Sequence, residues 1–235
     1  MSTLSRIFLV ITICFTSFSW GQELEAVTEI LSKVEARYSN SDQYTMEVLY
    51  QYFEPSQGEK AVETMEGLII KDGSNYYSKI HNTETVFINT DYIKINHDEK
   101  AVLYGLMDME QRPSPVELSK LSAYFTSAEV FQKGDIARFE LLFKESNMVP
   151  YRKMALTVNL KTYEILKQEL FLIAGQQMPG GQNPLARTSD GIVSVSFKEI
   201  PFSKKDSKRF LISDYIQKGA QVSLSKKLAT YSLYQ

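Results

Sequence analysis

The chain has 235 residues, with 26 basic and 28 acidic side chains, a formal net charge of −2 and one cysteine. Charges of both signs are well mixed, which provides no basic stripe of the kind that binds nucleic acid. The cysteine, Cys14, lies in a segment that we expect to be removed, which would exclude thiolate catalysis and cysteine-bound metal from the mature protein. No linker or internal repeat divides the rest, so residues 22–235 are interpreted as one domain, long enough to bury a core.

Residues 1–21 have the pattern of a cleavable signal peptide. Arg6 precedes an apolar run over residues 7–18, and Ser19 and Gly21 are small residues at the positions that a signal peptidase reads. The run is shorter than the roughly 20 residues that span a bilayer. Bulky Ile13 disfavours lipidation of Cys14, and an uncleaved anchor is the other alternative. We therefore expect export to the periplasm, or secretion, as a soluble monomer that does not span the membrane after cleavage.

Residues 23–38 are predicted to form an amphipathic helix, because apolar residues recur there at steps of three and four. The period then changes to two between Tyr44 and Tyr52, which indicates a strand with one covered face. Further strands are predicted at residues 62–70, 75–81, 85–89, 92–97 and 101–104. The connections are too short to contain crossover helices, so neighbouring strands should be antiparallel.

A second helix is predicted over residues 113–124. Ser114 is a suitable N-cap, Pro115 suits the first helical position and Glu117 completes a capping box. We expect the part from Glu117 to Phe125 to act as a movable lid with an apolar stripe.

Strands are expected again at residues 128–133, 136–144, 153–160 and 164–173. A polar stretch rich in glycine and proline follows at residues 174–190, and loops of this length tend to be functional or disordered. Alternation resumes at residues 192–199, and residues 210–215 and 228–234 are interpreted as short closing strands.

The sequence offers little for catalysis. His81 and His97 both lie at predicted strand ends, which favours a role in turns or edges over one in a catalytic triad. There is no nucleophile elbow, zinc motif, phosphate-binding loop or dinucleotide fingerprint. We therefore expect a protein that is not an enzyme and has no cofactor or metal. A short basic cluster is interpreted as a solvated loop: Lys204, Lys205, Lys208 and Arg209.

The order of these elements resembles that of the LolA-type periplasmic lipoprotein carriers and their LolB-like and other secreted relatives. The amphipathic helix leads directly into the aromatic strand at residues 44–53, and Gly67 precedes an apolar triplet in the next strand. Paired strands at residues 91–96 and 100–102 come before the helix in the place of that family's lid.

The resemblance implies an α+β, mainly β fold. Its curved antiparallel sheet would form an incomplete, half-open β-barrel with helices covering the concave side. One departure concerns the residues after the glycine strand, where the carriers have arginine and proline and the arginine helps to hold the lid shut. Here those residues are Lys71 and Asp72, and a lysine does not reproduce the planar fork of arginine.

The function we expect is binding of lipoprotein acyl chains, or another lipid, in the half-barrel cavity. The chain has 14 tyrosines and 13 phenylalanines, which suit such a cavity but also suit an ordinary filled core. The residues expected to line the cavity are Met46, Val48, Tyr50, Leu68, Ile93, Ile95, Leu118, Leu121, Phe125, Phe139, Leu141, Val195 and Phe197. The alternative is a non-enzymatic envelope module that uses the loop at residues 174–190 to bind a protein partner.

Overall fold

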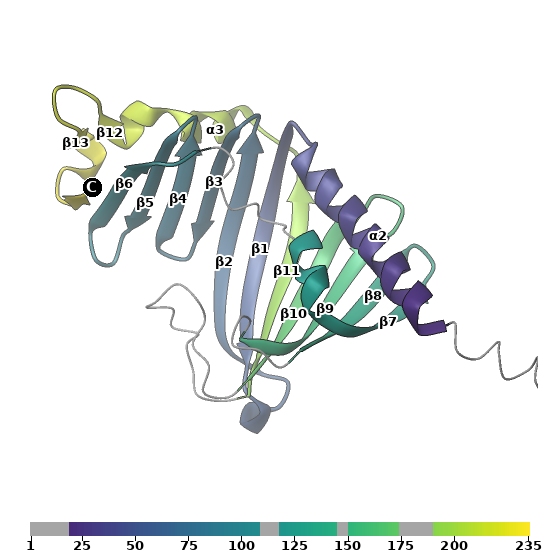
Figure 1. Cartoon of the computed structure of the whole chain (residues 1–235). Coiled ribbons are helices and arrows are strands. Elements are labelled where there is room, and N and C mark those ends of the chain that lie inside the picture. The colour runs from purple at the N-terminus through teal and green to yellow at the C-terminus, as the bar shows by residue number, and fades with distance from the viewer. Residues whose placement is uncertain (1–18, 109–117, 145–149, 174–189) are drawn as a thin grey trace, which may run out of the picture.

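A computed structural model describes residues 19–108, 118–144, 150–173 and 190–235, in which one long helix crosses a strongly curved sheet (Figure 1). In this part of the chain the sheet has twelve strands in the order β14-β6-β5-β4-β3-β2-β1-β11-β10-β9-β8-β7. β14 and β7 form the two edges, so the sheet is not closed into a barrel. The predicted signal peptide up to residue 18 and the loop at residues 174–189 lie outside the described residues.

The predicted strands are confirmed, with shifts of a few residues at their ends. The first half of the sheet contains β1 (Gln43–Phe53), β2 (Ala61–Asp72), β3 (Asn75–Ile80), β4 (Thr83–Ile88), β5 (Asp91–Asn96) and β6 (Ala101–Leu106). The second half contains β7 (Phe125–Lys133), β8 (Ile136–Phe143), β9 (Tyr151–Asn159), β10 (Glu164–Leu172) and β11 (Ile192–Ile200). Neighbouring strands within this set are antiparallel, as expected for short connections.

The predicted first helix is confirmed as α2 (Ser19–Ser39), which lies across the half of the sheet formed by β7 to β11 (Figure 1). Val27, Leu31 and Val34 are at most 1% exposed and belong to the core between this helix and the sheet. The last turn is also held by polar contacts. The guanidinium of Arg37 donates to both carboxylate oxygens of Glu199 at 2.9 and 3.1 Å, in β11.

The two faces of the sheet carry two separate hydrophobic cores. Successive residues of a strand point to opposite faces. Ile69 belongs to the first core, with α2, whereas Ile70 belongs to the second. The second core lies between β2–β6 and the C-terminal segment after β11, from which Tyr215, Ile216 and Leu228 are buried. The helix and the C-terminal segment therefore cover opposite faces and different halves of the sheet.

The C-terminal segment differs from its prediction. Residues 210–215 are not a strand. Most of them fall in the short 3₁₀ helices η4 (Lys208–Phe210) and η5 (Ile212–Asp214), and Phe210, Ile212 and Tyr215 pack on the second core instead of forming an edge strand. Of residues 228–234, only β14 (Ser232–Tyr234) is a strand, and it pairs with β6 in parallel. The remaining short elements are η1 (Pro55–Gln57), α3 (Lys204–Ser207), β12 (Ile216–Gln217), β13 (Ser223–Leu224) and η6 (Lys226–Leu228).

The second predicted helix is also corrected. Its expected cap, Ser114 to Glu117, lies outside the described residues. The part that follows is a 3₁₀ helix, η3 (Ser119–Tyr124), and not an α-helix. The helical segment ends at Tyr124, as predicted, and Phe125 already belongs to β7, where it stacks edge-to-face with Phe143 of β8 at 5.0 Å between ring centroids. Within the described ranges, a 3₁₀ helix therefore stands in place of the second α-helix expected over the concave side.

In the portion of the chain that the structure describes, no helix combines the length and the apolar character needed to cross a membrane.

Candidate functional site

An aromatic strip runs from the end of α2 onto β3, β4 and β5. We define it as Tyr38, Tyr44, Tyr76, Phe87 and Tyr92. The rings of Tyr38 and Tyr44 meet edge-to-face at 5.5 Å between centroids. Tyr76 and Phe87 are 6.2 Å apart, and Phe87 and Tyr92 are 5.0 Å apart. The strand register places the last three rings side by side on β3, β4 and β5. The strip therefore continues the first core beyond the end of α2.

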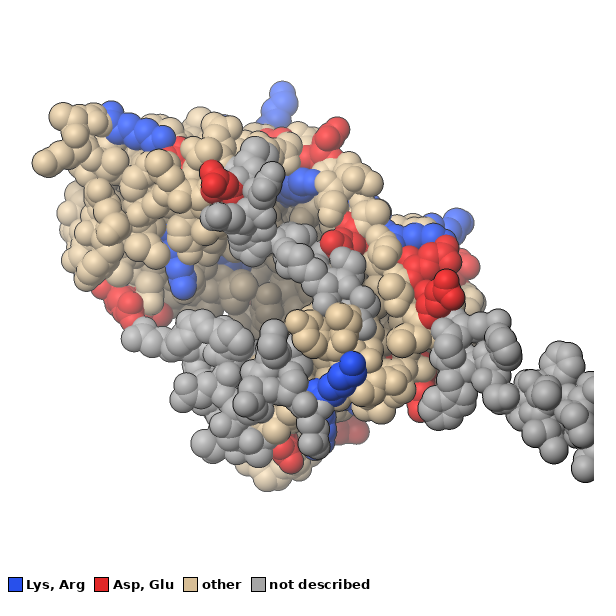
Figure 2. Space-filling view, in the orientation of Figure 1, with Lys and Arg blue, Asp and Glu red and all other residues tan. Residues whose placement is uncertain are grey.

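The strip is largely buried, since Tyr38, Tyr44 and Phe87 are 2% exposed, whereas Tyr76 and Tyr92 are partly exposed. Burial raises the pKa of the hydroxyl groups of Tyr44, Tyr76 and Tyr92, because the phenolate form would lose its hydration. Beside it, Tyr50 covers Gly67 of β2, where an added Cβ would lie 3.6 Å from the ring. Burial raises the pKa of Tyr50 in the same way. The surface seen from this side is hollowed between the α2 half and the β2–β6 half (Figure 2).

The residues expected to line one cavity are divided between the two cores. Leu68, Ile93 and Ile95 belong to the second core, on the face opposite α2. The structure brings the others together in the first core: Met46, Val48, Tyr50, Leu118, Leu121, Phe125, Phe139, Leu141, Val195 and Phe197. Most of these are almost fully buried, and Tyr50, Leu121 and Phe197 are partly exposed at its margin.

A second candidate site is a polar pocket of about 400 Å³ between the sheet and the C-terminal segment. Glu84 of β4 and Ile95 and His97 at the end of β5 line its sheet side. The C-terminal segment contributes the basic residues Lys205, Lys208, Arg209 and Lys227, together with Asp214, Tyr215, Leu228 and Tyr231. Since Ile95 belongs to the second core, this pocket lies on the face of the sheet opposite the aromatic strip.

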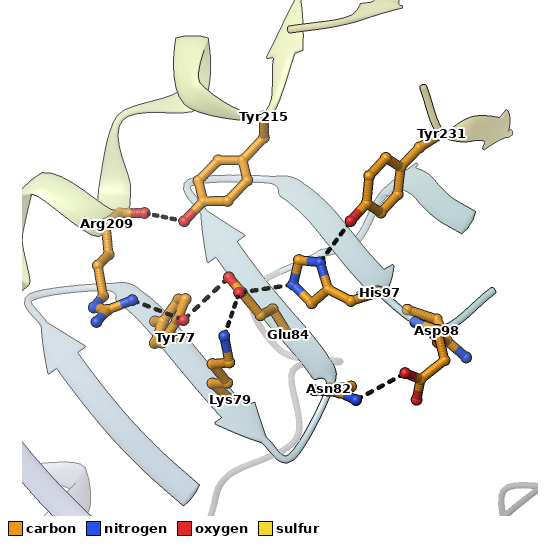
Figure 3. Close-up of polar contacts among 10 residues, drawn as sticks. Tyr77, Lys79, Asn82, Glu84, His97, Asp98, Arg209, Tyr215 and Tyr231 are labelled. Atoms are coloured by element: carbon orange, nitrogen blue, oxygen red, sulfur yellow. Dashed lines mark hydrogen bonds and ion pairs between the residues drawn. The ribbon is translucent and has the colours of Figure 1, made fainter. Parts of the chain in front are cut away.

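His97 links the sheet to the C-terminal segment at this pocket (Figure 3). Its Nε2 lies 2.8 Å from Oε1 of Glu84, and its Nδ1 lies 2.9 Å from the hydroxyl of Tyr231. Glu84 also accepts hydrogen bonds from Nζ of Lys79 at 3.1 Å and from the hydroxyl of Tyr77 at 3.0 Å. Burial by itself would raise the pKa of Glu84, but these hydrogen bonds outweigh it and hold the pKa below its usual value. Glu84 is therefore an ionised carboxylate, and both of its oxygens are hydrogen-bonded within the protein.

Arg209 extends this network toward the pocket. Its guanidinium donates to the Tyr77 hydroxyl at 2.8 Å and stacks over the Tyr77 ring, 4.7 Å from the centroid.

Asp214, which also lines the pocket, forms an ion pair with Lys227, at 2.7 Å between the charged atoms. Among the described residues, no group of three or more His, Cys, Asp or Glu side chains is placed to hold a metal ion.

Sequence reasoning missed this pocket. The basic cluster of residues 204–209 is the available signal, but its composition alone favours a solvated loop, and the sequence around His97 favours a strand end. His97 does lie just beyond β5. Its contact with Tyr231, 134 residues away, depends on how the C-terminal segment docks, and no local pattern encodes that.

No known family's sequence profile matches the chain, and no curated protein matches it. Several solved structures do. A LolA superfamily protein from Nitrosomonas europaea is 12% identical, covers 75% of this chain and 94% of its own, and gives a TM-score of 0.31. A domain of an outer-membrane lipoprotein-sorting protein from Vibrio parahaemolyticus is 12% identical, covers 77% and 96%, and gives 0.34.

A third match is a chain of the complex between the CwlD amidase and the GerS lipoprotein from Clostridioides difficile. It is 11% identical, covers 74% of this chain and 95% of its own, and has a TM-score of 0.31. The first of these proteins is a member of the superfamily that the sequence resembles. At such TM-scores and identities the likeness does not establish a family for this chain and says nothing of what it binds.

Proposed function

We propose that the protein is an exported, monomeric, non-enzymatic binding protein for an apolar ligand, such as the acyl chains of a lipoprotein or of another lipid. The ligand would lie against the aromatic strip, on the face of the sheet that α2 covers in part. The periplasm, or the space outside the cell, is where the expected signal peptide would deliver the protein.

The observation that carries this proposal is the extension of the strip beyond α2. A strip that served only to fill the core beneath the helix would end where the helix ends. Here Tyr76, Phe87 and Tyr92 continue it over β3, β4 and β5, beyond the end of α2 (Figure 1), and Tyr76 and Tyr92 are partly exposed on either side of buried Phe87. Tyrosine suits the edge of a lipid site, because its ring is apolar and its hydroxyl tolerates water.

Burial of an acyl chain would provide enough free energy for tight binding. Each methylene removed from water is worth about 0.8 kcal/mol, so an acyl chain of about 16 carbons offers on the order of 10 kcal/mol. A carrier must also release its cargo, and a sheet that is not closed into a barrel leaves a route for release.

The contacts of His97 do not favour a role as a general base. A general base needs a ring nitrogen within hydrogen-bond reach of the substrate. Both ring nitrogens of His97 already have protein partners, Glu84 and Tyr231.

The test is uptake of a fluorescent fatty acid by the purified mature chain and by two tyrosine variants. Tyr92→Glu places a charge on the strip, at a partly exposed position. Tyr234→Glu is the matched control, because Tyr234 of β14 is 57% exposed and lies outside the strip. We expect Tyr92→Glu to weaken uptake about tenfold, which corresponds to about 1.4 kcal/mol, and Tyr234→Glu to leave it unchanged. Absence of uptake by the unaltered protein, or equal effects of the two variants, would contradict the proposal.

A further inference from the structure

The polar pocket on the opposite face of the sheet carries an excess of positive charge. Its lining includes four cationic side chains, Lys205, Lys208, Arg209 and Lys227, and two carboxylates, Glu84 and Asp214. The excess is local, since the whole chain has a formal net charge of −2. A concentration of cations in a recess of an overall acidic protein attracts anions.

The two carboxylates are already occupied. Oε1 of Glu84 contacts Lys79 and His97, and its Oε2 accepts from Tyr77. Asp214 is paired with Lys227. By contrast, Lys205 and Lys208 form no ion pair with any residue that the structure describes, and Arg209 uses one of its five N–H donors on Tyr77. The pocket therefore offers cationic donors that the described carboxylates do not neutralise.

The pocket also has an apolar part. Ile95 and Leu228 are almost fully buried and belong to the second core, and the ring of Tyr215 lies beside them. A volume of about 400 Å³ falls in the range of small-molecule sites and exceeds what a bare phosphate ion needs. The combination suits a molecule with one strongly anionic end and a compact organic body.

We propose that this pocket binds a phosphate monoester, with the phosphate held by Lys205, Lys208 and Arg209 and the organic part against Ile95, Tyr215 and Leu228. Lysine and arginine are the side chains that bind phosphate, arginine through two parallel N–H donors and lysine as a point charge. The network of Glu84, His97 and Tyr231 positions the C-terminal segment that carries these cations (Figure 3). The site lies on the other face from the aromatic strip, so it does not depend on lipid binding there.

The experiment is calorimetric titration of the mature chain with phenyl phosphate. The variant Lys205→Gln/Lys208→Gln removes the two lysines without described ion pairs. The matched control, Lys60→Gln/Lys226→Gln, makes the same change of charge at two exposed lysines that do not line the pocket. We expect the first pair to weaken binding at least tenfold and the control to leave it within twofold. Thermal unfolding of all three proteins should show that both variants remain folded.

The proposal is overturned if phenyl phosphate does not bind, or if the two double variants weaken binding equally, which would indicate attraction to net charge alone. Cosedimentation with vesicles then distinguishes the source of the phosphate. Binding to vesicles that contain phosphatidic acid, lost in the Lys205→Gln/Lys208→Gln variant, assigns the site to a lipid headgroup. Binding of phenyl phosphate without such cosedimentation assigns it to a soluble ester. The Tyr92→Glu variant should bind phenyl phosphate normally in either case.

Discussion

The ammonium group of Lys71 donates a hydrogen bond to the carbonyl oxygen of Ser39 at 2.7 Å, and a second one to that of Tyr38 at 3.2 Å. Lys71 is in β2, and the two carbonyls end α2. The last carbonyls of a helix lack partners and carry partial negative charge, so a cation there is favourable. The position at which the chain departs from the carriers' arginine thus attaches the end of the helix to the sheet.

Replacing Lys71 by methionine keeps much of the apolar stem and removes both hydrogen bonds. We expect the free energy of unfolding to fall by about 1 kcal/mol. Urea denaturation checks this, with Lys60→Met as a control, because Lys60 is exposed in a turn and should change stability by less than about 0.5 kcal/mol. Equal losses in the two variants would mean that the contact with α2 contributes nothing.

Glu84 should make the stability of the protein depend on pH in the acidic range. Its pKa is lower in the folded protein than in the unfolded chain, where the usual value is 4.5. Between those two values the unfolded chain binds more protons, so stability falls as the pH falls. The contribution is complete above the unfolded pKa and is lost as the pH drops through the folded one.

The comparison is with Glu84→Gln, which cannot ionise. At pH 7 we expect this variant to be less stable by about 1–3 kcal/mol, because charged hydrogen bonds to His97 and Lys79 are lost. The difference between the two proteins, measured by denaturation from pH 7 to pH 3, should shrink below about pH 4.5. A constant difference across this range would show that the charge of Glu84 is not what stabilises the network.

Gly191 is a position where no side chain fits. A Cβ added there would collide with the ring and the hydroxyl of Tyr52, a core residue that is 1% exposed. We expect Gly191→Ala to destabilise the protein by about 1–3 kcal/mol, the usual cost of overpacking a core. The control is Gly105→Ala, since an added Cβ there meets no atom within 4 Å. If Gly191→Ala/Tyr52→Leu is no more stable than Gly191→Ala, the collision is not the cause.

Leu121 of η3 tests the margin of the first core, against which it packs while partly exposed. We expect Leu121→Glu to weaken uptake of a fluorescent fatty acid about tenfold and to lower stability by no more than about 1 kcal/mol. Leu211→Glu is the control, because Leu211 is 51% exposed and lies in the C-terminal segment. A loss of stability as large as the loss of uptake would make Leu121 an ordinary core residue.

The strands and α2 were predictable because their patterns are local. In β1, buried Tyr44, Met46 and Val48 are two residues apart, and in α2 the buried positions recur at helical spacing. The C-terminal segment was not predictable in this way. Tyr215 and Leu228 are buried by packing on strands more than a hundred residues earlier in the sequence. The apolar residues of this segment therefore show neither strand nor helix periodicity from which the structure could be predicted.

The candidate site was also predictable only as far as local patterns determine it. Sequence patterns identified which residues face the interior, and ten of the expected thirteen do share the first core. They did not show that the sheet buries both faces, which places Leu68, Ile93 and Ile95 behind it. The alternation of apolar and polar residues shows whether two residues of one strand lie on the same face of the sheet. It does not show whether residues of two distant strands share a face.

The parallel pairing of β14 with β6 also has a consequence for the order of folding. Ser232 lies opposite Ala101, so this edge forms only when segments far apart in the sequence meet. Contacts of this kind form slowly, since a long loop must close before any of them is gained. In refolding followed by pulsed hydrogen exchange, the amides of the β3–β4 and β4–β5 hairpins, whose partners are close in sequence, should therefore become protected before those of β14. The strands β3, β4 and β5 would form first, and the phosphate pocket, which needs the C-terminal segment, would be completed last.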